Sequence, residues 1–221
     1  MTAKRTITRF GLMRHAETMW NLENRIQSHS DSPLSAKGEK QGMQWGQILK
    51  GFHWDRILSS DTGRALATVR RINLTLKIPL MIDARLREQN WGQWTGKTVA
   101  QVKREEPGLL AEQIAAGWKF CPPEGENRLS IWKRSRTALV EAANQWPDET
   151  ILVVTHEGVI KSLIYRLSGR KFLPSEKPLI QSLHLHWLIY DNEEDLRLEG
   201  LNAISLWQKS ETGKRTEEKG F

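Results

Sequence analysis

Cysteine is nearly absent from this chain of 221 residues, since Cys121 is the single one. One cysteine cannot form an intramolecular disulfide, and a chain without such bridges suits a reducing compartment. Apolar runs of the ~20 residues that span a bilayer are missing as well. The basic amino terminus, residues 1–9, is not followed by the apolar core of a signal peptide. We therefore expect a cytoplasmic protein without a membrane partner.

Concentrated basic charge is also lacking, although the formal net charge is +7. The tail, residues 208–221, holds four basic and three acidic residues and contributes only +1. There is no basic run that would track a phosphate backbone, and no zinc-finger or RNA-binding motif. The ten tryptophans are scattered rather than interleaved with Lys and Arg, which indicates packing rather than base stacking. The composition argues against a nucleic-acid partner and favours a basic surface that attracts phosphate esters.

Internal repeats and low-complexity stretches are absent too, and the length suits one α/β domain with a sizeable core. We expect this domain to occupy residues 1–207 and the charged tail, residues 208–221, to be disordered. The sequence leaves a monomer and a homodimer both open.

Strand and helix patterns alternate along the chain. Strands are predicted at residues 7–13, 56–59, 80–83, 150–155, 182–190 and 203–207. Helices are predicted at residues 35–49, 62–76, 129–146 and 159–168, and another opens at the capping-box pattern of residues 98–101 and is interrupted at 107–108. The first helix should bury a face near Met43, Trp45 and Leu49. The alternation predicts an α/β fold, a three-layer α/β/α arrangement with a mainly parallel sheet.

Reactive side chains follow the first predicted strand. Residues 12–21 read Leu-Met-Arg-His-Ala-Glu-Thr-Met-Trp-Asn, so an apolar run ends in Arg14 and His15 before a polar loop. Such residues collect where strands of an α/β sheet reach its carboxyl edge. There an arginine can grip an oxyanion bidentately, and an imidazole can act as base, nucleophile or ligand. Taken alone, the pair could equally be a surface Arg-His at a strand end.

Three further segments have the same placement at strand ends or loops. Residues 59–65 read Ser-Ser-Asp-Thr-Gly-Arg-Ala, residues 86–96 read Leu-Arg-Glu-Gln-Asn-Trp-Gly-Gln-Trp-Thr-Gly, and residues 151–160 read Ile-Leu-Val-Val-Thr-His-Glu-Gly-Val-Ile. With the first segment, and in this order, they resemble the histidine phosphatase superfamily, also called the phosphoglycerate mutase-like family. The resemblance covers residues 7–169, with weaker support to residue 207, and implies a phosphoglycerate mutase-like fold.

The resemblance implies how the phosphate pocket works. A phosphate monoester carries about two negative charges, so a metal-free enzyme needs several cations around one phosphoryl group. Arg14, Arg64 and His156 match the positions that supply them, and His15 matches the nucleophile whose neutral imidazole forms a phosphohistidine. Its other ring nitrogen should donate to a backbone carbonyl and so fix the tautomer. No pair among the other histidines has metal-ligand spacing, so we predict no metal and no cofactor.

The same resemblance places the acid that protonates the leaving alkoxide at Glu88. A carboxyl group must stay protonated to serve in this way, so we expect partial burial against Trp91 or Trp94. Without the resemblance, Glu88 has an equal claim to be an ion-pair partner of Arg85 or Arg87.

Further positions are matched around the substrate. Asn21 matches a phosphate-facing asparagine, and Gln27 a position near the substrate mouth. Ser28 stands where glycine often follows, which would narrow or polarise the entrance. Glu157 stands where glycine commonly follows the second histidine. A carboxylate facing the pocket would repel phosphate, so we expect only the backbone N–H of Glu157 to contribute.

The resemblance thus implies a metal-independent phosphomonoesterase that acts through a phosphohistidine on a small phosphorylated metabolite. The segment after the Glu88 loop is shorter and less basic than the lid expected of a glycolytic mutase, which favours the phosphatase branch. Phosphoglycerate mutase-type phosphoryl transfer and a weakly catalytic scaffold for phosphorylated ligands stay open as alternatives. A cysteine phosphatase is excluded, because Arg128 lies one residue beyond the Cys-x5-Arg spacing from Cys121.

Overall fold

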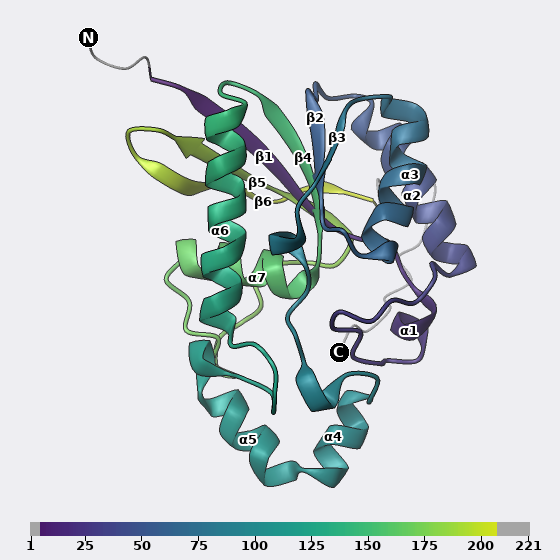
Figure 1. Cartoon of the computed structure of the whole chain (residues 1–221), viewed down its shortest axis with the longest axis vertical. Coiled ribbons are helices and arrows are strands. Elements are labelled where there is room, and N and C mark those ends of the chain that lie inside the picture. The colour runs from purple at the N-terminus through teal and green to yellow at the C-terminus, as the bar shows by residue number, and fades with distance from the viewer. Residues whose placement is uncertain (1–4, 207–221) are drawn as a thin grey trace.

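A six-stranded sheet lies at the centre of the protein (Figure 1) in the computed structural model, which describes residues 5–206. Its strands are β1 (Ile7–Arg14), β2 (Arg56–Ser59), β3 (Leu80–Ile82), β4 (Thr150–Thr155), β5 (His184–Asp191) and β6 (Asp195–Ser205). The strand order is β3-β2-β4-β1-β5-β6. Strands β3, β2, β4 and β1 are parallel to one another, and β5 and β6 add an antiparallel hairpin beside β1. The prediction of a mainly parallel sheet is confirmed.

Helices cover both faces of the sheet (Figure 1). One face carries α2 (Ala36–Leu49) and α3 (Gly63–Leu76), and the other carries α6 (Arg128–Gln145) and α7 (Glu157–Leu167). Shorter helices are α1 (Met19–Leu22), α4 (Val99–Glu105) and α5 (Pro107–Ala115), with single 3-10 turns at Ala84–Leu86, Gly92–Trp94 and Gly117–Lys119. The three-layer α/β/α arrangement is therefore as predicted.

The central strand β4 shows why the layers form. Ile151 and Val153 pack into the core beneath α6 and α7, whereas Leu152 and Val154 pack into the core beneath α2 and α3. Successive side chains of a strand point to opposite faces of the sheet. An unbroken apolar run therefore produces a strand that is buried on both sides, as parallel sheets require.

Local sequence signals set where the helices begin. The hydroxyl of Ser35 accepts a hydrogen bond from the first turn of α2 at 2.9 Å. The capping box predicted at Thr98 and Gln101 opens α4, Pro107 is the first residue of α5, and Asn127 caps α6. Side-chain caps satisfy N–H groups that have no partner within the helix. The predicted starts at residues 35 and 62 are caps, so each helix begins one residue later.

Two local expectations are wrong. Met43 is 47% exposed, whereas Trp45 and Leu49 of the same helix are buried. Trp45 and Leu49 are four residues apart and share one face of the helix. Met43 lies two residues before Trp45, so it points to roughly the opposite side. The last strand is also longer than predicted, because β6 pairs with β5 from Asp195 onward. Residue 207 of that predicted strand and the tail at 208–221 lie outside the described residues.

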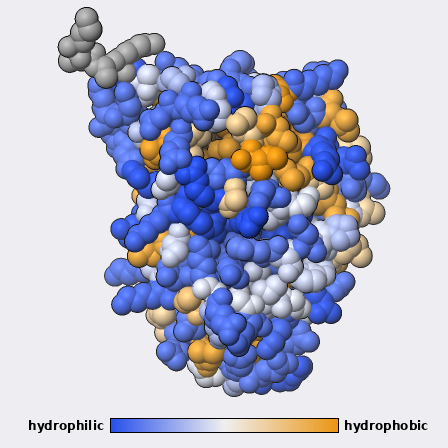
Figure 2. Space-filling model, viewed as in Figure 1, coloured by the Kyte–Doolittle hydropathy of each residue, from blue (hydrophilic) through white to orange (hydrophobic). Residues whose placement is uncertain are grey.

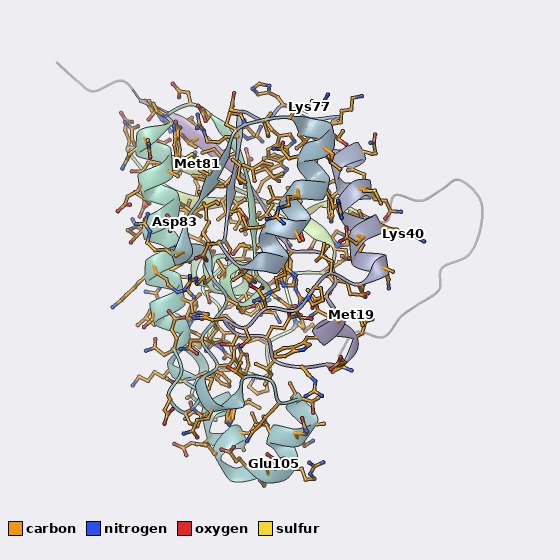
Figure 3. The ribbon with its side chains drawn as sticks, turned by 45° about the vertical axis from the view of Figure 1, so that its right-hand side comes forward. Met19, Lys40, Lys77, Met81, Asp83 and Glu105 are labelled. Carbon is orange, nitrogen blue, oxygen red and sulfur yellow. The ribbon has the colours of Figure 1, made fainter. Side chains whose placement is uncertain are left out.

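The carboxyl ends of the parallel strands point toward the half of the molecule that holds α4 and α5 (Figure 1). In Figure 3, the label Met81 marks edge strand β3 in the upper half of the molecule, and the label Glu105 marks the end of α4 in the lower half. Most of the face in Figure 2 is hydrophilic, and apolar colour gathers in its upper half, where β3 exposes residues 80–82. None of the helices between residues 5 and 206 has the length and apolar character to cross a membrane.

Candidate active site

A cavity of about 340 Å³ lies at the carboxyl edge of the sheet. Eight of the nine predicted site residues line it: Arg14, His15, Asn21, Gln27, Ser28, Arg64, Glu88 and Glu157. The ninth, His156, lies beside His15, with the two ring centroids 5.2 Å apart. The volume falls in the range of small-molecule sites, about 300–1,000 Å³. Folding therefore brings the predicted residues together in one place.

His15 directly follows β1 and is only 4% exposed. Its Nδ1–H donates to the backbone carbonyl of Ala16 at 2.8 Å, the contact expected from the sequence, so the lone pair is on Nε2. Burial, followed by the charges of Arg14 and Arg64, holds the pKa of His15 well below its usual range. The imidazole is therefore neutral near pH 7, which is the form that a nucleophile requires.

His156 directly follows β4 and is completely buried. Its Nε2 lies 2.9 Å from the hydroxyl of Ser60 and 3.3 Å from that of Thr62, while its Nδ1 is buried without a partner. Burial, and then the charge of Arg64, lowers the pKa of His156 well below its usual range, so the expectation that this histidine supplies a cation is wrong. The two hydroxyls belong to the loop after β2. They lie close to His156 because β2 is the neighbour of β4 in the sheet.

The buried histidines predict a loss of stability in acid. Burial lowers the pKa of His186 to about 4, and His15 and His156 are lowered too, whereas an unfolded histidine has a pKa of about 6.5. Below about pH 6.5 the unfolded chain thus binds more protons than the folded one. The stabilisation is present above that pH and is lost as the pH falls toward 4, by roughly 1.4 kcal/mol per pH unit for each histidine.

Urea unfolding between pH 7 and pH 5 measures this slope. His186→Asn keeps an acceptor, its Oδ1, for the N–H of Asn202, which contacts His186 Nδ1 at 3.1 Å. That variant should lower the slope by about a third, since one of three titrating groups is removed. An identical slope in the two proteins would contradict the assignment of His186 as a neutral buried group.

The guanidinium of Arg64 is fixed by the loop that follows β1. Its Nη2 donates to the carbonyl of Ser28 at 2.7 Å, and its Nη1 donates to the carbonyl of Ser30 at 2.8 Å and to Asp31 at 3.1 Å. Asp31 also accepts from the N–H of Gly63 at 2.7 Å, so it caps α3, whose own N-cap makes no side-chain hydrogen bond. Among the residues described, Nε of Arg64 has no hydrogen-bond partner, so this donor is available on a residue that lines the cavity.

The backbone at Ser28 accounts for the glycine that often occupies this position in the family. Its φ is 53°, in the left-handed region that favours glycine. The serine hydroxyl accepts from the N–H of Trp91 at 2.9 Å and lies 3.4 Å from Asn90 Oδ1. The hydroxyl therefore links the cavity entrance to the Glu88 loop, and these hydrogen bonds offset backbone strain.

Asn21 and Gln27 also line the cavity from the loop after β1. Oδ1 of Asn21 accepts from the N–H of Thr18 at 3.0 Å in the capping box of α1, so this cap uses the oxygen of the side chain and not its NH2 group. Gln27 is 7% exposed, and its Oε1 is buried without a partner. Both side chains can therefore offer hydrogen bonds to a ligand.

The carboxylate of Glu88 is held at the amino end of α7. It accepts from the N–H of Gln89 at 2.8 Å and from that of Gly158 at 3.3 Å. A Cβ added at Gly158 would lie 2.2 Å from Glu88 Oε1, so a larger residue would displace the carboxylate. Glu88 is half-buried beside Trp91 in the cavity lining, whereas Trp94 packs in a separate apolar cluster.

Glu88 makes no ion pair with Arg85 or Arg87 among the residues described. Arg85 pairs with two other carboxylates, and Arg87 lies 2.5 Å from Asp61. Arg134 of α6 donates to the backbone carbonyl of Glu88 at 3.0 Å and fixes the loop. The carboxylate of Glu88 is therefore directed to α7 and the cavity.

The expectation for Glu157 is wrong, because its carboxylate does face the cavity. It lies 2.6 Å from Nη1 of Arg14 and 2.5 Å from Nζ of Lys161. The charge of Arg14, ahead of that of Lys161, lowers the pKa of Glu157 to about 2. At the first position of α7 the side chain reaches back to the end of β1, where it neutralises Arg14. Glu157 thus competes with any other anion for this arginine.

Glu157→Gln should therefore strengthen the binding of inorganic phosphate. We expect its inhibition constant to fall about tenfold, which corresponds to roughly 1.4 kcal/mol, the scale of one hydrogen bond to a charged group. Glu199→Gln is the matched control, because Glu199 pairs with Arg9 at 2.7 Å with similar exposure and does not line the cavity. An equal fall of the inhibition constant in both variants would show that the effect comes from net charge and not from the release of Arg14.

The sequence interpretation missed several residues that line the cavity: Arg25, Arg128, Lys161, Ser162 and Phe172. The spacing of Lys161, four residues after Glu157 on a helix, was a usable signal for an ion pair. The others come from segments with no recognisable motif. Within residues 5–206, no group of three or more His, Cys, Asp or Glu side chains could hold a metal ion.

Comparison with known proteins shows to which family the chain belongs. A sequence model of the histidine phosphatase superfamily (branch 1) matches residues 10–203. The "Probable phosphoglycerate mutase GpmB" of Escherichia fergusonii is 34% identical over 158 residues, which are 72% of this chain and 74% of that protein.

Solved structures resemble the whole fold. YhfR of Bacillus stearothermophilus has a TM-score of 0.81 at 30% identity and covers 90% of this chain and 98% of its own. The mycobacterial glucosyl-3-phosphoglycerate phosphatase, solved with VO3, has a TM-score of 0.73 at 28% identity. The match covers 91% of this chain and 100% of the phosphatase chain. By its fold, its four ordered motifs and these matches, the chain belongs to branch 1 of the histidine phosphatase superfamily.

Proposed function

We propose that the protein is a phosphomonoesterase that transfers the phosphoryl group of a small metabolite to His15 and then to water. One observation carries the proposal: the neutral His15, with its tautomer fixed by Ala16, shares a cavity with Arg14, Arg64 and the carboxylate of Glu88. This set contains a nucleophile, cations for the phosphoryl oxygens and a proton carrier, which are the three parts that the reaction needs.

In the first step, Nε2 of His15 attacks phosphorus while the bond to the leaving alkoxide breaks. The protonated carboxyl of Glu88 gives its proton to that alkoxide, so an alcohol departs. Arg14 and Nε of Arg64 donate to the phosphoryl oxygens, and Arg14 must exchange Glu157 for the phosphate to do so. The unpartnered Nδ1 of His156 adds a polar contact beside His15.

In the second step, the Glu88 carboxylate takes a proton from a water molecule, and the oxygen of that water attacks phosphorus. The bond from phosphorus to Nε2 breaks, His15 regains its neutral lone pair, and inorganic phosphate leaves. Glu88 is protonated again and ready for the next substrate. Two backbone N–H groups fix the position of this carboxylate in the lining of the cavity, and both proton transfers need a carboxyl group held near phosphorus.

Charge in the segment after the Glu88 loop supports hydrolysis rather than mutase transfer. Residues 99–115, which form α4 and α5, hold two basic and three acidic side chains. A phosphohistidine is kept for a second hydroxyl only when water is excluded, and a basic lid over an anionic substrate would help to exclude it. Mutase transfer remains the second candidate, because a relative carries that name.

Phosphorus NMR with 3-phosphoglycerate separates the two functions, and a chelator can be added to the same reaction. We expect inorganic phosphate to accumulate and its rate to be unchanged by exhaustive chelation, because arginines already neutralise the phosphoryl group. An isomeric phosphoester that forms faster than inorganic phosphate would establish a mutase. A loss of activity that magnesium, manganese or zinc restores would contradict metal independence.

A further inference from the structure

One cation in the cavity lining has no carboxylate partner among the residues described. Five cationic side chains line the cavity. Four of them pair with carboxylates: Arg14 with Glu157 at 2.6 Å, Lys161 with Glu157 at 2.5 Å, Arg25 with Glu23 at 2.5 Å and Arg64 with Asp31 at 3.1 Å. For Arg128, no carboxylate within the described part of the chain comes within 4.0 Å, and its hydrogen bond goes to a backbone carbonyl. Its charge is therefore available to an anion in the cavity.

Aromatic rings hold the guanidinium of Arg128 in place. It lies over the rings of Phe120 and Phe172, 4.2 and 4.5 Å from their centroids, and donates one hydrogen bond to the carbonyl of Gly117 at 3.0 Å. Burial lowers its pKa to about 10, so it is cationic at neutral pH. A guanidinium stacked on rings keeps its remaining donors at its edge, a geometry that suits the oxygens of carboxylate or phosphate.

Arg128 lies away from the phosphate end of the cavity. Gly158 and Ser162 both line the cavity from α7, and four residues of helix span about 6 Å. Gly158 contacts Glu88 at the reacting end. Arg128 stacks on Phe172, and Phe172 packs on Tyr165 with ring centroids 4.6 Å apart. Tyr165 follows Ser162 by about one turn of α7. A ligand that reaches Arg128 from His15 therefore extends along one to two turns of α7.

Two unpartnered polar atoms lie in the same lining. Oε1 of Gln27 and Oγ of Ser162 make no hydrogen bond within residues 5–206, and the two residues are only 7% and 1% exposed. A buried polar atom without a partner is unfavourable, so such atoms indicate where a ligand supplies the missing hydrogen bonds. Gln27 Oε1 can only accept, which fits a hydroxyl group of the ligand.

We propose that Arg128 forms a second anion subsite. The substrate is then a small phosphomonoester with a second anionic group, carboxylate or phosphate, at the end away from the scissile bond, and with hydroxyl groups between the two. The assignment of the phosphate end rests on the function proposed above. The second subsite rests on Arg128, Gln27 and Ser162, none of which takes part in that chemistry.

Matched substrates that differ in one charge test the proposal. The carboxylate arm compares 3-phosphoglycerate with its methyl ester, and the phosphate arm compares fructose 1,6-bisphosphate with fructose 6-phosphate. In each arm the wild-type protein should favour the more anionic member in kcat/KM. The better arm identifies the chemistry of the second group. Comparable kcat/KM for the two members in both arms would overturn the proposal.

Arg128→Gln should lower kcat/KM for the favoured anionic substrate by about 10- to 100-fold, mainly through KM, as expected for a lost hydrogen bond to a charged group. The neutral member should change little, and Arg128→Lys should recover part of the preference. Arg166→Gln is the control, since Arg166 lies 5.9 Å from the ring of Trp118 and does not line the cavity. Equal losses for both members in Arg128→Gln would show that Arg128 only holds the fold.

Calorimetric binding to the His15→Ala protein separates this proposal from the function proposed above. The charge preference should persist there even though no phosphoryl group can be transferred. If wild-type protein turns over neutral monoesters while neither protein prefers a second anion, only the subsite is wrong. If the preference persists while the wild-type protein has no phosphatase activity, only the function is wrong.

Discussion

Replacing His15 by alanine should abolish the covalent phosphoenzyme and lower turnover by roughly 10⁴-fold or more, the scale seen when a nucleophile is removed. The wild-type protein, incubated with labelled substrate and quenched, should carry phosphate that is labile in acid and stable in base, as a phosphoramidate is. The reason is structural, since the bond from Nδ1 to Ala16 leaves Nε2 of His15 as the reactive nitrogen.

His53→Ala is the control, because His53 is exposed, lies 3.0 Å from Asp55 and does not line the cavity. His15→Asn complements the alanine variant, since its amide NH2 can still donate to a backbone carbonyl. The labelling should be normal in His53→Ala and absent from both His15 variants. Label that persists on the His15→Ala protein would contradict the assignment of His15 as the nucleophile.

Replacing Glu88 by glutamine should have an effect that depends on the leaving group. An alkoxide needs a proton to depart, whereas nitrophenolate leaves largely unaided. Phosphorylation by an alkyl phosphate should therefore slow by roughly 10²- to 10⁴-fold, the range typical of a general acid, and phosphorylation by nitrophenyl phosphate should slow much less. Glutamine keeps an oxygen that can accept from Gly158, so the loop should stay in place.

The phosphorylation step must be read from the burst phase. Glu88 also activates water in the second step, so steady-state turnover mixes its two roles. Equal damage to phosphorylation by both substrates would show that Glu88 positions the substrate instead. The acid would then be sought among other carboxylates, with Glu17 and Glu126 the next to be replaced.

Sequence alone located the catalytic segments because their signals are local. The strands at residues 56–59 and 150–155 have the predicted bounds, since short apolar runs bounded by polar residues are read within a few positions. Arg14, His15 and His156 end or directly follow such strands, and parallel strands bring their carboxyl ends to one edge. The shared cavity follows from that rule, while the catalytic roles of its residues stay predictions for the experiments above.

Only the tertiary structure decided what each side chain contacts. Glu157 was expected to turn away from the cavity, yet it pairs with Arg14 from a strand 143 positions earlier in the chain. Asp31 caps α3 from a separate loop, and Arg128 reaches the cavity through its stacking on Phe120 and Phe172. Such contacts depend on distances between segments far apart in sequence. No local pattern contains those distances, because they arise when the sheet and its helical layers pack together.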